Sequence, residues 1–148
     1  MKTTVFMRVV GAIFLLSLIT FECPAASLNG NYEGYLSYKR TIKRGNISCN
    51  SYSSSIHLKI TSVRVKGNVV NGIVNSTVGD KRFKGKVKGN GFIATVKFPG
   101  IYYGLRWKMT FTLSKVSPSS ANAKLENWSS KNARTYCNYV YSGTIGRS

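Results

Sequence analysis

The chain holds few side chains that could act as catalysts. Its only histidine is His57, and three of its four acidic residues, Glu33, Asp80 and Glu126, lie beyond position 26. A Ser-His-Asp site would need a carboxylate brought to His57 from a distant turn, and no Gly-x-Ser-x-Gly elbow is present. A two-carboxylate glycosidase would need two of the three acids to converge on one cleft. We therefore expect no catalytic residues and no enzymatic activity, and a small secreted hydrolase is the weakest hypothesis.

The cysteines favour a disulfide over a metal site. Of three cysteines, Cys23 lies in an N-terminal segment that we expect to be removed, which leaves Cys49 and Cys137. Two cysteines and one histidine are too few ligands for a structural zinc site, and no phosphate loop or dinucleotide fingerprint occurs. We therefore expect no metal and no cofactor. In an oxidising compartment the two cysteines most simply form a disulfide, which would stabilise the domain by roughly 4–5 kcal/mol in the chain-entropy description.

The first residues have the layout of a secretory signal. Lys2 and Arg8 precede an uncharged apolar run, Val9–Phe21, which is followed by small residues. A membrane anchor is the alternative, but a span needs about 20 apolar residues and this run is shorter. We expect residues 1–26 to be a cleavable signal peptide and residues 27–148 to form one domain without a transmembrane span. The expected destination is outside the cell, with the periplasm as the alternative.

The expected domain is strongly basic. Removing Lys2 and Arg8 from the 22 basic residues leaves 20, and removing Glu22 from the four acids leaves three, so its net charge is about +17. A magnitude of about 2–8 is enough to keep a small domain soluble. An excess of this size attracts nucleic acid, anionic lipid headgroups, acidic polysaccharide or acidic proteins. The alternative is a generically basic secreted protein whose charge only keeps it apart from its neighbours.

The pattern of apolar residues predicts an all-β domain. Apolar and polar residues alternate in short segments that are rich in Val, Ile, Thr, Tyr and Phe and separated by Gly and Asn. The longest row, Leu105, Trp107, Met109, Phe111 and Leu113, places five apolar residues on one face. We expect an antiparallel meander of about eight strands with one disulfide, closed as a small barrel or folded as a sandwich. The predicted strands lie near 31–42, 54–66, 68–77, 82–88, 92–98, 105–116, 121–127 and 134–145, with longer loops at Ser117–Ser120 and Trp128–Asn132.

Two clusters of basic residues are candidate binding sites. The first, around the end of the first predicted strand, comprises Lys39, Arg40, Lys43 and Arg44. The second comprises Lys81, Arg82, Lys84, Lys86 and Lys88, with Arg64 and Lys66 as an extension from the preceding hairpin. Residues two apart share a face of a strand, so Arg82, Lys84, Lys86 and Lys88 would form a row at about 6–7 Å spacing. An acidic protein or an anionic polymer would relieve the repulsion within this row, whereas the alternative is a solvated outer face.

Three aromatic residues are candidates for contact with a partner. Tyr102, Tyr103 and Trp128 fall in predicted loops, where they would be exposed to a protein or a sugar, or would plug a barrel end. Nucleic-acid modules interleave cations with exposed aromatics, but Phe83 faces inward within the basic row. We therefore expect nucleic acid as a partner only if the protein is delivered into a host cell. In that case the string Lys39–Arg44 could also serve as a nuclear address.

Short glycine motifs carry a resemblance to known proteins. The opening Leu28–Gly34, the hairpin segments Lys66–Gly72 and Phe83–Val87, and the late Cys137–Tyr141 resemble small exported Gram-negative β proteins of mostly unassigned function. The opening is also similar to the first strand of avidin- and lipocalin-type barrels, although Tyr32 replaces their usual tryptophan. The resemblance implies an up-and-down barrel, but it does not imply that this chain binds the ligands of those barrels.

The leading hypothesis from the sequence is a secreted, non-enzymatic binding protein. It would be effector-like or inhibitor-like and would engage an acidic or anionic macromolecule of a host or rival through its basic strands. If it acts as an effector, its destination is the host cell. The alternative hypothesis is a resident periplasmic barrel that binds a small ligand or the cell envelope.

Overall fold

The computed structural model describes residues 27–50, 52–76, 78–101 and 103–148, so the predicted signal peptide and Tyr102 lie outside the described residues. These residues form an all-β domain, as predicted. The described part of the chain contains no helix that could cross a membrane. Its eight strands, in chain order, are β1 (Gly30–Arg44), β2 (Ser55–Lys66), β3 (Val69–Ser76), β4 (Gly79–Val87), β5 (Phe92–Lys97), β6 (Arg106–Ser114), β7 (Ser120–Asn132) and β8 (Thr135–Arg147).

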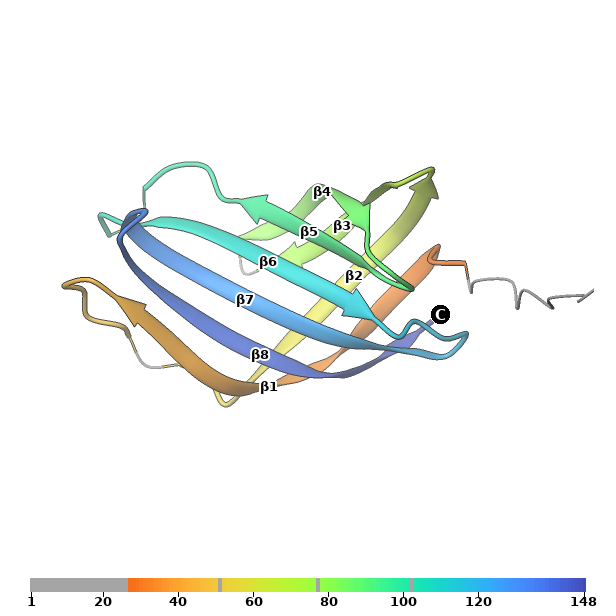
Figure 1. The fold of residues 1–148 in the computed structure, drawn as a ribbon, viewed down its shortest axis with the longest axis horizontal. Helices are drawn as coiled ribbons and strands as arrows, with labels where there is room; N and C mark the ends of the chain where they lie inside the picture. The colour runs from red at the N-terminus through yellow and green to blue at the C-terminus, as the bar shows by residue number, and fades with distance from the viewer. Residues whose placement is uncertain (1–26, 51, 77, 102) are drawn as a thin grey trace, which may run out of the picture.

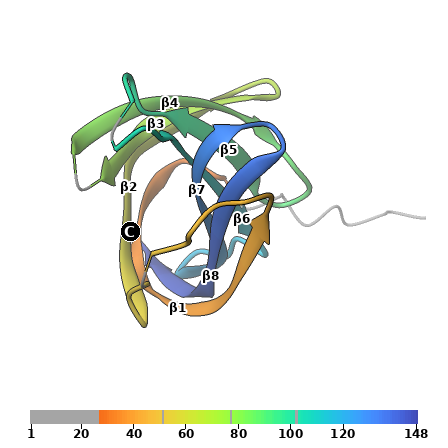
Figure 2. The ribbon, with the colours of Figure 1, turned by 90° about the vertical axis from the view of Figure 1, so that its left-hand side faces the viewer.

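The strands close into a barrel. Each strand pairs antiparallel with the next along the chain, and β8 returns to pair with β1, with Tyr38 opposite Tyr141. The strands curve around a common axis (Figures 1 and 2). The choice between barrel and sandwich is thereby decided, and the closed sheet has no free edge strand that could pair with another chain.

All eight predicted strands are present in the predicted order, and the clearest difference is the length of β7. The sequence predicts a strand that ends at residue 127 and a loop at Trp128–Asn132, but β7 continues to Asn132. Trp128 pairs with Lys108 of β6 on one side and with Asn138 of β8 on the other. The predicted loop is therefore wrong, because β7 lies between β6 and β8, which give this polar segment pairing partners on both sides.

One end of the barrel is filled by aromatic side chains. Tyr32, Phe92 and Phe111 are fully buried, and Phe83 is 5% exposed. The Phe83 and Phe111 rings meet edge to face with their centroids 5.0 Å apart. A fully buried side chain of this size contributes about 1.5–3 kcal/mol through the hydrophobic effect. We call this end, where the hairpin turns of residues 67–68 and 88–91 lie, the filled end.

The opposite end is the mouth, where loops 45–54, 98–105 and 133–134 connect the strands. The predicted disulfide between Cys49 and Cys137 is present and joins the first of these loops to β8. Such a bond is typical of an oxidising, extracytoplasmic compartment. At the filled end, the Arg147 guanidinium donates hydrogen bonds to the backbone carbonyls of Ser117 and Asn29. The chain is thus tied together at both ends of the barrel.

Candidate functional site

The strand register brings five cations onto one outer surface. Asn71 of β3 lies between Arg64 of β2 and Lys84 of β4. In the next row, Val69 lies between Lys66 and Lys86 in the same way. Because neighbouring strands are about 4.8 Å apart, the backbones within each cation pair are separated by about 10 Å. We define the basic face as the exposed residues Arg64, Lys66, Arg82, Lys84 and Lys86.

Alternation along β4 separates most of the predicted row from the core. Arg82, Lys84 and Lys86 are exposed, whereas Phe83 between the first two is buried. Lys88 is also exposed, but it lies in the turn that follows β4. Because cross-strand partners share a face of the sheet, Arg64 and Lys66 of β2 lie on the same outer face as Lys84 and Lys86 of β4.

Lys81 does not belong to this surface. It is half-buried and pairs with Val74, whose side chain is fully buried inside the barrel. Lys81 therefore lies on the inward side of β4 and apart from the basic face.

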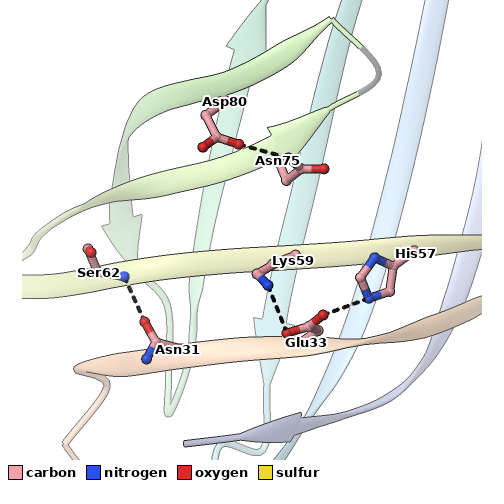
Figure 3. A network of polar contacts seen from close by, with 7 residues as sticks. All are labelled: Asn31, Glu33, His57, Lys59, Ser62, Asn75 and Asp80. Atoms are coloured by element: carbon pink, nitrogen blue, oxygen red, sulfur yellow. Dashed lines mark hydrogen bonds and ion pairs between the residues drawn. The ribbon is translucent and has the colours of Figure 1, made fainter.

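The acidic residues that the structure describes make their polar contacts outside these five cations, although Asp80 precedes Arg82 by two residues on β4. Glu33 contacts His57 at 3.0 Å and Lys59 at 3.4 Å, while Glu126 contacts Lys124 at 3.3 Å. Asp80 instead accepts a hydrogen bond from the Asn75 amide at 2.8 Å. Figure 3 shows Glu33 between His57 and Lys59, and Asp80 turned toward Asn75. Among the described residues, no carboxylate forms an ion pair with the basic face.

The first predicted basic cluster lies near the mouth. Arg40 and Arg44 pair with Val140 and Tyr136 of β8, while Lys43 pairs with Cys137 and so has the opposite side-chain orientation. Lys39 falls at the irregularity between Tyr38 and Arg40. The basic face lies toward the filled end of β2 and β4. The two predicted clusters are therefore at opposite ends of the barrel and do not form one surface.

The predicted aromatic contacts have different surroundings. Tyr103 lies in the loop before β6 and is 99% exposed. Trp128 is not an exposed loop residue, because it is half-buried on β7 between β6 and β8. The Lys108 ammonium lies 4.4 Å from the centroid of its ring, and the Tyr136 ring centroid is 4.9 Å away. Trp128 is thus packed into the barrel wall, while Tyr103 remains free to contact a partner.

The mouth contains a cavity that the sequence does not predict. Its volume is about 740 Å³, and its lining is mainly aromatic and aliphatic, including Tyr52, Phe98, Trp107, Met109, Tyr139 and Tyr141. Polar side chains also line it, namely Asn50, Ser53, His57, Asn75, Ser76, Lys108 and Asn127. The inward apolar row that contains Trp107 is visible in the sequence. However, the cavity beside this row cannot be predicted from it, because the cavity depends on which end of the barrel the core side chains fill.

Tyrosines form one wall of this mouth. The Tyr38 and Tyr52 rings are stacked with their centroids 3.5 Å apart, and the Tyr139 hydroxyl donates a hydrogen bond to the Asn50 carbonyl at 3.2 Å. Burial raises the pKa of Tyr139 and of Tyr141 above the usual value. Both hydroxyls therefore stay neutral at physiological pH and can donate hydrogen bonds.

The contact between Glu33 and His57 is a second feature that sequence reasoning misses. It results from the pairing of β1 with β2, which places Tyr35 opposite His57 and Glu33 opposite Lys59. The side chains of His57 and Glu33 are 39% and 50% exposed, so the pair contributes at most about 1 kcal/mol. Among the described residues, no hydrogen bond joins His57 to a hydroxyl or thiol.

The described residues include no group of three or more His, Cys, Asp or Glu side chains that could hold a metal ion. The site features thus define a small disulfide-bonded barrel with a cationic outer surface and an open apolar mouth. Comparisons with protein-family models, with curated proteins and with solved structures give no match to this chain.

Proposed function

We propose that this chain is an exported, non-enzymatic binding protein that engages an acidic or anionic macromolecule through its basic face. One observation carries the proposal. The register of β2, β3 and β4 aligns five cations on one surface, and no described carboxylate forms an ion pair with them.

Electrostatics explains why such a surface favours an anionic partner. Like charges at this spacing repel one another, and each contact with an anion removes part of that repulsion. The net charge of about +17 adds a long-range attraction that speeds the encounter with an anionic partner at low ionic strength. The partner's charge density and the salt concentration therefore control binding together.

Export limits the kinds of partner that the protein meets. The signal-like N-terminus and the Cys49–Cys137 disulfide both support a destination outside the cytoplasm. We therefore favour an effector-like or inhibitor-like role toward an acidic protein or an anionic polymer of a host or rival. Nucleic acid enters this proposal only if the protein reaches the inside of a host cell.

The mouth cavity supports a second candidate function. A resident periplasmic barrel that binds a small ligand would need an accessible apolar cavity, and the mouth provides one of about 740 Å³. This function uses a different part of the molecule from the basic face, so separate variants can test the two functions.

Partner capture with two charge-matched variants tests the proposed function. In the first variant, Arg64→Glu, Lys84→Glu and Lys86→Glu reverse three charges of the basic face. In the control, Lys97→Glu, Lys131→Glu and Arg134→Glu reverse two lysines and one arginine that are exposed elsewhere. Both variants have the same net charge. The immobilised exported proteins are exposed to host or competitor extracts at low and at high salt, and the retained macromolecules are identified.

We expect the wild-type protein and the control to retain the same anionic macromolecule at low salt and to release it at high salt. The basic-face variant should lose it. Equal retention by both variants, or equal loss from both, would contradict a role for the basic face in particular.

A further inference from the structure

We infer that the mouth of the barrel is a binding site for a planar aromatic molecule that carries a carbonyl or carboxylate oxygen. This site is separate from the basic face; the inference rests on the second candidate function, small-ligand binding in the mouth, and specifies the class of ligand. Its volume of about 740 Å³ lies within the range of roughly 300–1,000 Å³ that is typical of small-molecule sites.

The cavity wall favours flat rings. Trp107 and Phe98 line it together with Tyr52, Tyr139 and Tyr141, so an inserted ring can stack or meet an aromatic edge. Leu58 and Leu125, each 1% exposed, line it toward the filled core. A ligand that buries a flat apolar surface here would replace water against these side chains.

Polar groups on the wall favour an oxygen acceptor. Asn127 pairs with Met109 and Tyr139, which are both buried, so its amide belongs to the inward face of β7. No side-chain hydrogen bond of Asn127 is seen among the described residues, although its amide can donate two. The buried indole N–H of Trp107 likewise has no acceptor among them. A carbonyl or carboxylate oxygen on the ligand would give the Asn127 amide a partner.

The mouth is built so that this wall keeps its position. The disulfide joins Cys49 to β8, and the loop that follows contributes Asn50 and Tyr52 to the lining. Tyr139 donates its hydroxyl hydrogen bond to Asn50, and Tyr52 stacks on Tyr38. A site whose walls are fixed before binding loses less conformational entropy when the ligand enters.

Calorimetric titration with 2-naphthoate tests this inference, with decanoate as an aliphatic carboxylate of similar size and equal charge. Asn127→Leu removes the amide donor from the cavity wall. Asn122→Leu makes the same change on the outer face of β7, where the residue is exposed, and serves as the matched control. Ring-current shifts of backbone amides in nuclear magnetic resonance spectra locate the bound ring independently of these variants.

We expect saturable binding of 2-naphthoate that is several-fold tighter than that of decanoate, with ring-current shifts at Trp107 and Tyr139. Asn127→Leu should weaken binding roughly tenfold, as expected for the loss of one hydrogen bond to a charged acceptor, while Asn122→Leu should leave it unchanged. Three results would each overturn the inference: no saturable binding up to about 1 mM, equal affinity for decanoate, or ring-current shifts confined to the basic face. None of them bears on partner capture by the basic face.

Discussion

The salt dependence of polyanion binding gives a quantitative test of the basic face. With duplex DNA as a polyanionic probe, each neutralised phosphate contributes about −0.9 to the slope of log K against log salt concentration. Five contacts, one for each cation of the basic face, predict a slope of about −4.5. The affinity should then fall by about 500-fold between roughly 50 and 200 mM salt.

Neutralising two of the five cations should change this slope by a calculable amount. The double variant Lys84→Gln/Lys86→Gln leaves three contacts, so we expect a slope of about −2.7 and a fall of about 40-fold over the same salt range. The control Lys97→Gln/Lys131→Gln has the same net charge and should retain the wild-type slope. Fluorescence anisotropy of a short labelled duplex, titrated at several salt concentrations, measures all three slopes.

Two results of this experiment would refute the reasoning. If both double variants lower the slope equally, the probe responds to the total charge of the domain and has no preferred surface. If Lys84→Gln/Lys86→Gln retains the wild-type slope, those lysines do not contact the polyanion. In either case the alignment of the cations by the strand register would have no consequence for binding.

Three further predictions concern stability. Replacing Cys49 and Cys137 by alanine opens a loop with a sequence separation of 88. The chain-entropy relation predicts that the free energy of unfolding in urea falls by about 4–5 kcal/mol. A loss below about 1 kcal/mol would contradict that relation for this protein. In Gly91→Ala the new Cβ would clash with the Leu113 carbonyl oxygen of β6, so we expect a cost of at least about 1–3 kcal/mol in urea unfolding. The control Gly146→Ala, whose nearest contact is 3.6 Å away, should cost less, and equal costs would argue against this packing. Burial raises the pKa of Tyr32, so the contribution of its neutral hydroxyl to stability is complete below about pH 10 and is lost as the pH rises through the folded-state pKa. The free energy of unfolding, measured from about pH 8 to 12, should show this loss in the wild type and less of it in Tyr32→Phe. Identical pH profiles for the two proteins would contradict the assignment.

Much of the fold can be predicted from local patterns in the sequence. The alternation at Trp107, Met109 and Phe111 predicts one inward face, and all three side chains do lie inside the barrel or line its mouth. Whether the sheet closes depends on the pairing of β1 with β8, which are far apart in the sequence and carry no local signal for it. The continuation of β7 through Trp128 is missed for a different reason, because Ser and Asn in that segment favour a loop while pairing with β6 and β8 holds it as a strand.

The candidate sites are predictable to different extents. The period of two in a strand places Lys84 and Lys86 on one face, and the structure has them there. The alignment of Arg64 with Lys84 across Asn71 requires the register of three strands, which only the structure gives. The mouth cavity could not be predicted, because an unfilled space depends on how side chains from many strands pack together.

Lysine footprinting tests the central claim most directly. The exported protein is acetylated briefly with and without a sulfated oligosaccharide as the anionic probe, and mass spectrometry reports the modification of each lysine. We predict protection of Lys66, Lys84 and Lys86, with Lys97 and Lys131 modified as in the free protein. Protection spread evenly over all exposed lysines, or centred on Lys39 and Lys43, would contradict the assignment of binding to the basic face.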